Sequence, residues 1–239
     1  MDQELRRLAV ELAEGAGKLL KDAVPSGQQS KSSPTDLVTD ADLAAEQFIV
    51  ERLRAERPDD SIIAEEGSLS EGTSGIRWVI DPLDGTINFV YGIPQWCVSI
   101  GIEGNVRIGV IHDPNRSETF TDVDRFEPSR KTDLDDALVG TGFSYSADKR
   151  TRQAETLQRV LPNVRDIRRA GSCALDLAWV ACGRFDAFYE EDTYHWDISA
   201  GIALIESAGA SVRTYGPVTI AAGTEELLDK LESLVMRNG

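Results

Sequence analysis

The chain has 239 residues, of which 41% are hydrophobic and 28% charged, and its formal net charge is −16 at pH 7. This composition predicts an ordinary globular protein with a sizeable core, in one large domain or two closely packed halves. The acidity disfavours nucleic acid and anionic membranes as partners, and no run of 18 apolar residues predicts a transmembrane helix. The acidic start lacks the features of a signal peptide, and the three cysteines form no C-x-x-C pattern. A cytoplasmic location is therefore expected.

Hydrophobic periodicity and turn residues predict alternating helices and strands in the first half. A helix is expected over residues 5–20, a polar loop over 26–34, and a second helix from Thr39 or Asp40 that ends before Pro58. Strands are expected at residues 61–64, 77–80, 96–103, 106–112 and 118–121, the third and fourth joined as a hairpin at Gly104-Asn105.

A highly charged stretch from Asp122 to Asp136 is the predicted boundary, which divides the chain into halves 1–125 and 126–239. In the second half we expect strands at residues 137–140, 164–167, 185–189 and 211–213. We expect helices over 151–161, from Ser172, from Asp197, and over the leucines between 227 and 234. No internal repeat is present.

The run Asp81-Pro82-Leu83-Asp84-Gly85-Thr86 follows an apolar strand and carries the strongest chemical signal. Pro82 donates no backbone hydrogen bond, so it is expected to stop the ladder and turn the chain. Asp81 and Asp84 would then converge, with the carbonyl of the intervening leucine between them. Gly85 permits close backbone approach, and a helix starting there would offer free N–H groups to a phosphate. Taken alone, the run is also compatible with a simple tight turn.

Two further carboxylates argue against a simple turn. Glu65 also follows an apolar strand, and Asp197 follows Trp196 at a predicted helix start, where it would also suit a helix cap. Together with Asp81 and Asp84 they form an all-oxygen ligand set. The chain has only two histidines and no thiolate cluster, and hard oxygen ligands without imidazole favour Mg²⁺ over zinc. A bound cation would also reconcile an acidic protein with an anionic substrate.

Five blocks of sequence, in order along residues 31–209, resemble the inositol monophosphatase family. They are Lys31 to Asp42 (KSSPTDLVTDAD), Ala64 to Gly67 (AEEG), Trp78 to Phe89 (WVIDPLDGTINF), Arg169 to Ala174 (RAGSCA) and Trp196 to Gly201 (WDISAG). The resemblance implies an α/β (α+β) fold, a layered αβαβα sandwich of the fructose-1,6-bisphosphatase and inositol monophosphatase type. It also implies a lithium-sensitive phosphatase that uses two or three Mg²⁺ ions, acts on a small phosphate monoester and forms a homodimer.

The resemblance assigns roles position by position. The metal ligands would be Glu65, Asp81, the Leu83 carbonyl, Asp84 and Asp197. The catalytic residues would be Asp42 and Thr86, which orient or deprotonate the attacking water, together with Glu65. The substrate-binding residues would be Asp84, Gly85, Thr86, Gly171, Ser172, Cys173, Glu190 and Asp197, with Glu190 as the polyol-binding residue. Two bound cations can activate a water and stabilise the leaving oxygen without a covalent phosphoenzyme.

The chain also departs from the family pattern. A glycine-rich hairpin expected after Thr121 is missing, as is a short stretch around residues 216–218, which puts the sheet edges and the usual dimer contacts in doubt. His195 and Trp196 are expected to serve positioning and packing rather than chemistry.

The substrate is open at this stage. Inositol 1-phosphate is preferred, with histidinol phosphate or fructose 1,6-bisphosphate as alternatives on the same site. Two other classes remain as alternatives: a haloacid dehalogenase-type phosphatase using Asp40, whose motif fits poorly, and a non-catalytic binding protein on the phosphatase fold.

Overall fold

The computed structural model describes residues 1–23, 29–30 and 37–236. Most of the predicted polar loop, and the family block from Lys31 to Asp36, lie outside the described residues. Within the predicted loop, strand β1 (Gln29–Ser30) pairs antiparallel with β2 (Leu37–Val38), which the sequence did not predict.

The first large sheet has six strands in the order β4-β3-β5-β6-β7-β8. Its strands are β3 (Ser61–Ala64), β4 (Leu69–Ser70), β5 (Ile76–Asp84), β6 (Cys97–Gly104), β7 (Ile108–Asp113) and β8 (Glu118–Thr121). Only β3 and β5 pair in parallel, and the remaining neighbours are antiparallel. The predicted hairpin of β6 and β7 is confirmed.

The second sheet has five strands in the order β10-β9-β11-β13-β12. Its strands are β9 (Leu138–Thr141), β10 (Asp166–Arg168), β11 (Ala187–Glu191), β12 (Ser211–Tyr215) and β13 (Val218–Ala222). Strand β9 is parallel to both of its neighbours, whereas β11, β13 and β12 run antiparallel in turn.

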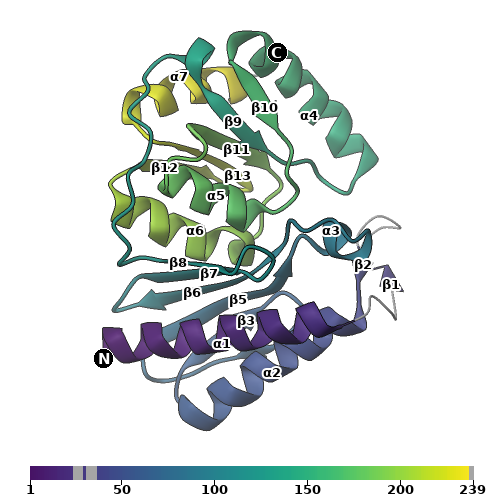
Figure 1. Cartoon of the computed structure of the whole chain (residues 1–239), viewed down its shortest axis with the longest axis vertical. Helices are drawn as coiled ribbons and strands as arrows, with labels where there is room; N and C mark the ends of the chain where they lie inside the picture. The colour runs from purple at the N-terminus through teal and green to yellow at the C-terminus, as the bar shows by residue number, and fades with distance from the viewer. Residues whose placement is uncertain (24–28, 31–36, 237–239) are drawn as a thin grey trace.

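Seven α-helices and two 3₁₀ turns complete the described part of the chain. The helices are α1 (Asp2–Asp22), α2 (Asp40–Glu56), α3 (Thr86–Val90), α4 (Ala147–Val160), α5 (Cys173–Ala181), α6 (His195–Ala208) and α7 (Glu225–Val235), and the turns are Leu134–Asp136 and Leu161–Asn163. Helices α1 and α2 cover one face of the first sheet, α5 and α6 lie between the two sheets, and α4 and α7 cover the outer face of the second sheet (Figure 1). The predicted αβαβα sandwich is therefore confirmed.

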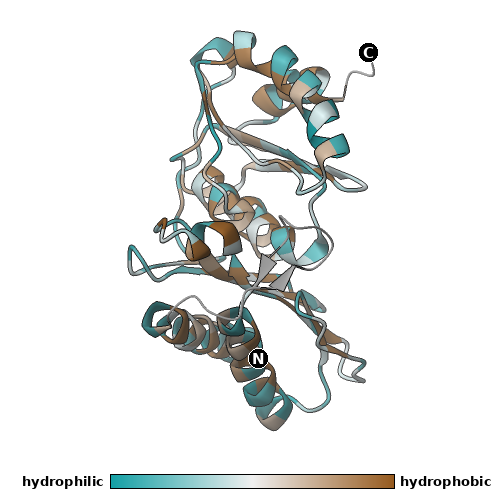
Figure 2. Cartoon of the chain, turned by 90° about the vertical axis from the view of Figure 1, so that its right-hand side faces the viewer, coloured by the Kyte–Doolittle hydropathy of each residue, from teal (hydrophilic) through white to brown (hydrophobic). Residues whose placement is uncertain are grey.

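The hydrophobic core follows these layers. One cluster lies between α1, α2 and the first sheet, a second surrounds α5 and α6, and a third lies under α7. Figure 2 shows apolar colour concentrated along the strands and on parts of the helices, while the outer turns are more hydrophilic. Because α5 and α6 follow the predicted boundary but pack on the first sheet as well as the second, the two halves share the middle layer.

Several predicted boundaries were wrong. Strand β5 does not end before Asp81 but continues through the proline, and the helix containing Asp197 begins two residues earlier, at His195. Strand β13 was not predicted, since the chain around residues 216–218 was interpreted only as a missing stretch. It follows a two-residue hairpin loop in which Gly216 takes φ +60°, a conformation that glycine adopts without strain.

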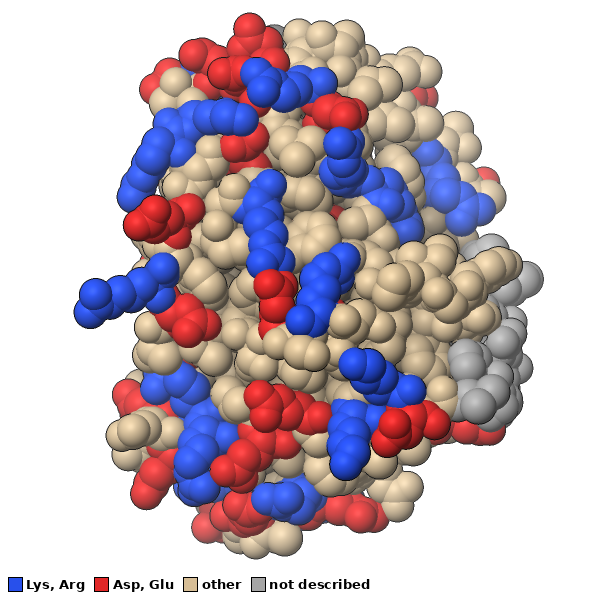
Figure 3. All heavy atoms as spheres, in the orientation of Figure 1, with Lys and Arg blue, Asp and Glu red and all other residues tan. Residues whose placement is uncertain are grey.

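Charged side chains of both signs are mixed on the surface, although the net charge of the chain is −16. On the face shown in Figure 3, acidic and basic side chains are interspersed rather than gathered by sign.

Within the described residues no helix is both long and apolar enough to cross a membrane. Between Thr121 and Leu138 the chain forms no strand, consistent with the absence of the expected hairpin.

Candidate active site

A cleft of about 700 Å³ lies where the first sheet, the start of α5 and the second sheet meet. It is lined by Glu65, Asp81, Leu83, Asp84, Gly85, Thr86, Gly171, Ser172, Cys173, Glu190 and Asp197, among others. These are all of the predicted site residues except Asp42. Sequence segments more than 100 residues apart are thus brought to one cavity.

The run from Asp81 to Thr86 forms an irregular end of strand β5. The ladder to β6 is interrupted between Asp81 and Asp84 and then resumes, so Pro82 causes a bulge and does not stop the strand as predicted. The Leu83 N–H donates to Asp81 Oδ1 at 3.0 Å, and the Thr86 hydroxyl donates to the Leu83 carbonyl at 3.2 Å. These short-range bonds hold both aspartates at the cleft.

Gly85 lies in close contact with the segments that carry Gln95 and Gly171. Its φ is +102°, and a Cβ atom there would lie 3.0 Å from the Gln95 carbonyl oxygen, 3.1 Å from Trp96 Cβ and 3.2 Å from the Gly171 carbonyl oxygen. Both the backbone conformation and the close contacts therefore require glycine. Helix α3 begins at the next residue, and the first N–H groups of a helix have no intrahelical partner.

Asp42 does not line the cleft and is the third residue of α2. Its carboxylate accepts hydrogen bonds from the backbone N–H of Thr39 at 2.9 Å and from the Thr39 hydroxyl. The Asp42 backbone N–H donates to the Thr39 hydroxyl oxygen at 3.4 Å, which completes a capping box. The other carboxylate oxygen of Asp42 lies 3.1 Å from the Thr86 hydroxyl, which shares its single proton between Asp42 and the Leu83 carbonyl. Burial raises the pKa of Asp42, opposed by the Thr39 bonds. The structure thus joins Asp42 to Thr86 across the interface of α2 and α3.

Asp84 holds the N-terminus of α5. Its Oδ2 accepts from the Ser172 hydroxyl at 2.6 Å and from the Ala174 backbone N–H at 2.7 Å, and the Cys97 thiol lies 3.8 Å away. Burial raises the pKa of Asp84 to about 6 although the bonds from Ser172 and Ala174 oppose the shift. One predicted ligand therefore also positions predicted substrate contacts.

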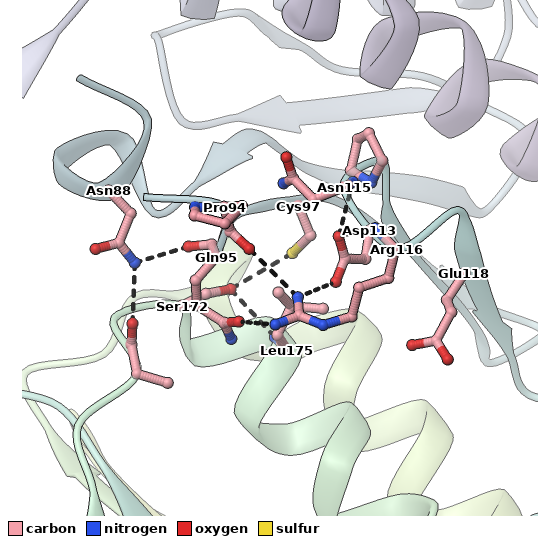
Figure 4. A network of polar contacts seen from close by, with 12 residues as sticks. Asn88, Pro94, Gln95, Cys97, Asp113, Asn115, Arg116, Glu118, Ser172 and Leu175 are labelled. Carbon is pink, nitrogen blue, oxygen red and sulfur yellow. Dashed lines mark hydrogen bonds and ion pairs between the residues drawn. The ribbon is translucent and has the colours of Figure 1, made fainter. Parts of the chain in front are cut away.

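Asn88 ties the neighbouring loops together (Figure 4). Its amide donates to the Gln95 carbonyl at 2.7 Å and to the Ala170 carbonyl at 2.9 Å. Arg116 in turn donates to the Gln95 side chain at 2.8 Å and to buried Asp113. The sequence did not single out these positioning residues, because their partners are distant in the chain.

The start of α6 supplies the last predicted ligand. Asp197 is its third residue and accepts from the Tyr194 backbone N–H at 2.7 Å. His195 lies 2.7 Å from Glu103 on β6, in agreement with a positioning role. Trp196 stacks on Tyr194 with ring centroids 5.3 Å apart, and both residues line the cleft.

The acidic residues of the cleft repel one another. Burial, followed by the charges of Glu65, Asp84 and Asp197, raises the pKa of Asp81 well above its ordinary value. The pKa of Asp197 is raised in the same way, by burial first and then by neighbouring carboxylates. Such clustered, oxygen-only donors fit a hard divalent cation, which would relieve their repulsion.

The residue types in the cleft suit a divalent cation, but the positions of their side chains do not form a coordination site. Over residues 1–23, 29–30 and 37–236, no three His, Cys, Asp or Glu side chains are arranged to hold a metal ion as they stand. The carboxylates would therefore have to draw together around a cation.

The sequence model of the inositol monophosphatase family matches residues 1–237. The chain belongs to the inositol monophosphatase family. It is therefore an enzyme of the phosphoric monoester hydrolase class.

Curated relatives and solved structures agree with this membership. The chain is 42% identical over 215 residues to the inositol-1-monophosphatase of Mycobacterium bovis. The aligned region covers 82% of this chain and 74% of that relative. The chain is 38% identical over 227 residues to the Nus factor SuhB of Escherichia coli K12, spanning 87% and 84%. The extragenic suppressor protein suhB of Bartonella henselae has a TM-score of 0.90 at 33% identity, covering 99% of this chain and 100% of that one. An IMPase of Thermotoga maritima has a TM-score of 0.86 at 31% identity, covering 98% and 97%.

In this inositol monophosphatase-family chain, Glu190 lines the same cleft. Its carboxyl group packs against Gly142, where a Cβ atom would lie 2.1 Å from a Glu190 oxygen. Burial, and then the charge of Asp84, raise the pKa of Glu190 to about 8, while Arg169 opposes the shift. A carboxyl group that is largely protonated at neutral pH can both donate to and accept from a hydroxyl.

Glu190 should make the metal-free fold less stable as pH rises. Its folded pKa of about 8 lies above the ordinary 4.5, so the native state binds more protons than the unfolded state between these values. We expect urea unfolding to show stability falling from about pH 5 to about pH 9, with Glu190 contributing about 2–4 kcal/mol of the decline. Glu190→Gln should make the decline shallower by that amount. Exposed Glu155→Gln is the matched control, and equal slopes in both variants would contradict the assignment.

Glu46 is a buried carboxylate beside the site that the sequence did not single out. It is 5% exposed, on the buried face of α2, and its two carboxylate oxygens accept the backbone N–H groups of Glu66 at 2.7 Å and Ser68 at 3.0 Å. These bonds hold the loop that carries Glu65. Only the periodicity of α2, which places Glu46 beside buried Ala45 and Ile49, hinted that it is buried.

Glu46→Gln is expected to destabilise the fold by about 2–3 kcal/mol, because an amide group replaces one of two buried charged acceptors. The Glu65 loop would lose part of its hold, so the Mg²⁺ concentration for half-maximal activity should rise. Urea unfolding and a Mg²⁺ titration check both effects. Glu51→Gln, exposed on the same helix, should change neither, and a Glu46→Gln variant that behaves like this control would contradict the positioning role.

Proposed function

We propose that the chain hydrolyses a small phosphate monoester with Mg²⁺, and that inositol 1-phosphate is its preferred substrate. The observation that carries the proposal is the meeting of Glu65, Asp81, Asp84 and Asp197 at one cleft. That cleft also contains the Asp42-bound Thr86 hydroxyl on one side and Glu190 on the other.

The metal ligands in this proposal are Glu65, Asp81, the Leu83 carbonyl, Asp84 and Asp197. Two or three Mg²⁺ ions, when bound there, would neutralise phosphoryl charge and make the attacking water more acidic. The cations held by these carboxylates would thus allow an anionic substrate to bind to a protein of net charge −16.

The remaining roles fall to polar groups around the phosphate. Asp42 holds the Thr86 hydroxyl, whose oxygen can accept a hydrogen bond from the attacking water and orient it, and Glu65 lines the same cleft. Gly85 and the first N–H groups of α3 face the phosphate.

The alcohol part of the substrate would lie against Gly171, Ser172, Cys173 and Glu190. The half-buried Glu190 carboxyl offers a polyol hydroxyl both a donor and an acceptor, which favours inositol 1-phosphate over the alternative substrates.

The alternative function is a non-catalytic binding role. It is retained because the Escherichia coli relative is named Nus factor SuhB and not a phosphatase. Mg²⁺-stimulated phosphate release separates the two. The purified protein should release phosphate from inositol 1-phosphate faster than from histidinol phosphate or fructose 1,6-bisphosphate. Activity should vanish with EDTA and fall on Li⁺ titration. No release from any of these esters would overturn the proposal and favour the binding role.

The proposal extends to a cytoplasmic homodimer, in which half 1–125 contributes most of the metal ligands and half 126–239 contributes substrate contacts and the last metal ligand, Asp197. Cell fractionation and light scattering after gel filtration test the location and the oligomeric state.

A further inference from the structure

Asp176 is a buried acidic residue that no role above uses. It lies on α5, is 1% exposed and lines the cleft. Its Oδ1 has no hydrogen-bond partner among the residues that the structure describes. An unsatisfied buried polar atom costs about 1–3 kcal/mol, so its presence at the wall of a cleft points to a ligand.

The position of Asp176 on its helix supports this reading. Cys173, three residues earlier, also lines the cleft, and residues three apart lie on one face of a helix. Asp176 therefore lies one turn farther along the same wall. An acidic residue in the first turn is also favoured by the helix dipole, but the dipole acts equally on an exposed carboxylate and does not explain complete burial.

The groups around Asp176 belong to the end of the cleft that receives the alcohol. Glu190, Asp84 and Arg169 are the ionisable groups close enough to act on its carboxyl group. Helix α5 packs against β11, the strand that carries Glu190. Two carboxyl groups from different layers thus face one region of the cleft, and such groups suit hydroxyl donors on adjacent carbons of a polyol.

We propose that Asp176 is a second specificity-determining residue, which accepts a hydrogen bond from a substrate hydroxyl beside the one that Glu190 contacts. The site would then select polyol phosphates with at least two free hydroxyls. This inference rests on the proposed phosphatase function.

The test compares a substrate that carries the polyol with one that lacks it. Asp176→Leu removes both oxygens at similar volume, and Asp176→Asn keeps one. With inositol 1-phosphate, kcat/KM should fall about 10–100-fold in the leucine variant, chiefly through KM, and less in the asparagine variant. With p-nitrophenyl phosphate, which has no aliphatic hydroxyl, both variants should stay within about twofold of the parent. Asp148→Asn, exposed near the cleft but not lining it, controls for a general charge effect.

A binding measurement keeps the inference separate from the phosphatase activity. Calorimetry with myo-inositol, inorganic phosphate and Mg²⁺ should show weaker inositol binding in both Asp176 variants. If the parent hydrolyses nothing, the proposed function fails, and this titration still decides the role of Asp176. Equal losses on both phosphate esters, or unchanged inositol binding, would overturn the inference. Selective loss of histidinol phosphate hydrolysis would also overturn it, because the carboxylate would then recognise an ammonium group.

Discussion

Asp81→Asn is expected to lower kcat/KM about 10³-fold, equivalent to about 4 kcal/mol of transition-state stabilisation, while the fold stays intact. Asparagine keeps the Oδ1 acceptor that Asp81 offers to the Leu83 N–H, so the local backbone should not change. It removes the negative charge that a cation requires. It also removes a carboxyl group whose pKa is raised first by burial and then by the charges of Glu65, Asp84 and Asp197. The metal-free variant should therefore be more stable than the parent, by about 1–2 kcal/mol.

Three measurements check this combination: phosphate release with Mg²⁺, circular dichroism, and urea unfolding in EDTA. Asp59→Asn makes the same chemical change at an exposed position and should leave all three unaltered. Near-parental activity in Asp81→Asn would refute the ligand assignment. A large loss of metal-free stability would instead show that Asp81 holds the fold rather than a cation.

Gly85→Ala is expected to destabilise the protein by about 2–4 kcal/mol and to lower kcat/KM at least about 100-fold. The added Cβ would take an unfavourable φ of +102° and press on the carbonyls of Gln95 and Gly171. Those carbonyls belong to the segments that Asn88 clamps, so relief of the contact must move the substrate wall away from the phosphate loop.

Gly209→Ala separates strain from contact. Gly209 ends α6 at φ +72°, and its Cβ would have no atom within 4 Å. That variant should lose about 1 kcal/mol and retain activity. Urea unfolding and steady-state kinetics distinguish the two. Equal effects in both variants would mean that backbone strain, and not the junction of three segments, explains the requirement at Gly85.

Much of the fold was predictable because its signals are local. The hairpin of β6 and β7 follows from a glycine-containing turn between two apolar runs, and the capping pair Thr39 and Asp42 marks the start of α2. Strand β13 escaped because five residues after a Gly-Pro turn carry too little pattern to identify a strand.

The four proposed carboxylate ligands Glu65, Asp81, Asp84 and Asp197 were also predictable, because each lies at the end of an apolar strand or the start of a helix and in a block of family sequence. Their energetic partners were not. Glu46 reaches a loop 20 residues away, and Asn88 reaches Ala170 across 82 residues. No periodicity or turn signal records such a contact.

The sequence by itself determined the family, the order of most elements and the acidic residues available for a cation, since these depend on neighbouring residues and on matched motifs. Only the tertiary structure decided that Asp42 is joined to Thr86, that Asp84 is bound to the start of α5, and that Asp176 is buried beside Glu190. The physical reason is that burial and hydrogen bonding set what a carboxylate does, and both are supplied by segments that meet only when the layers pack.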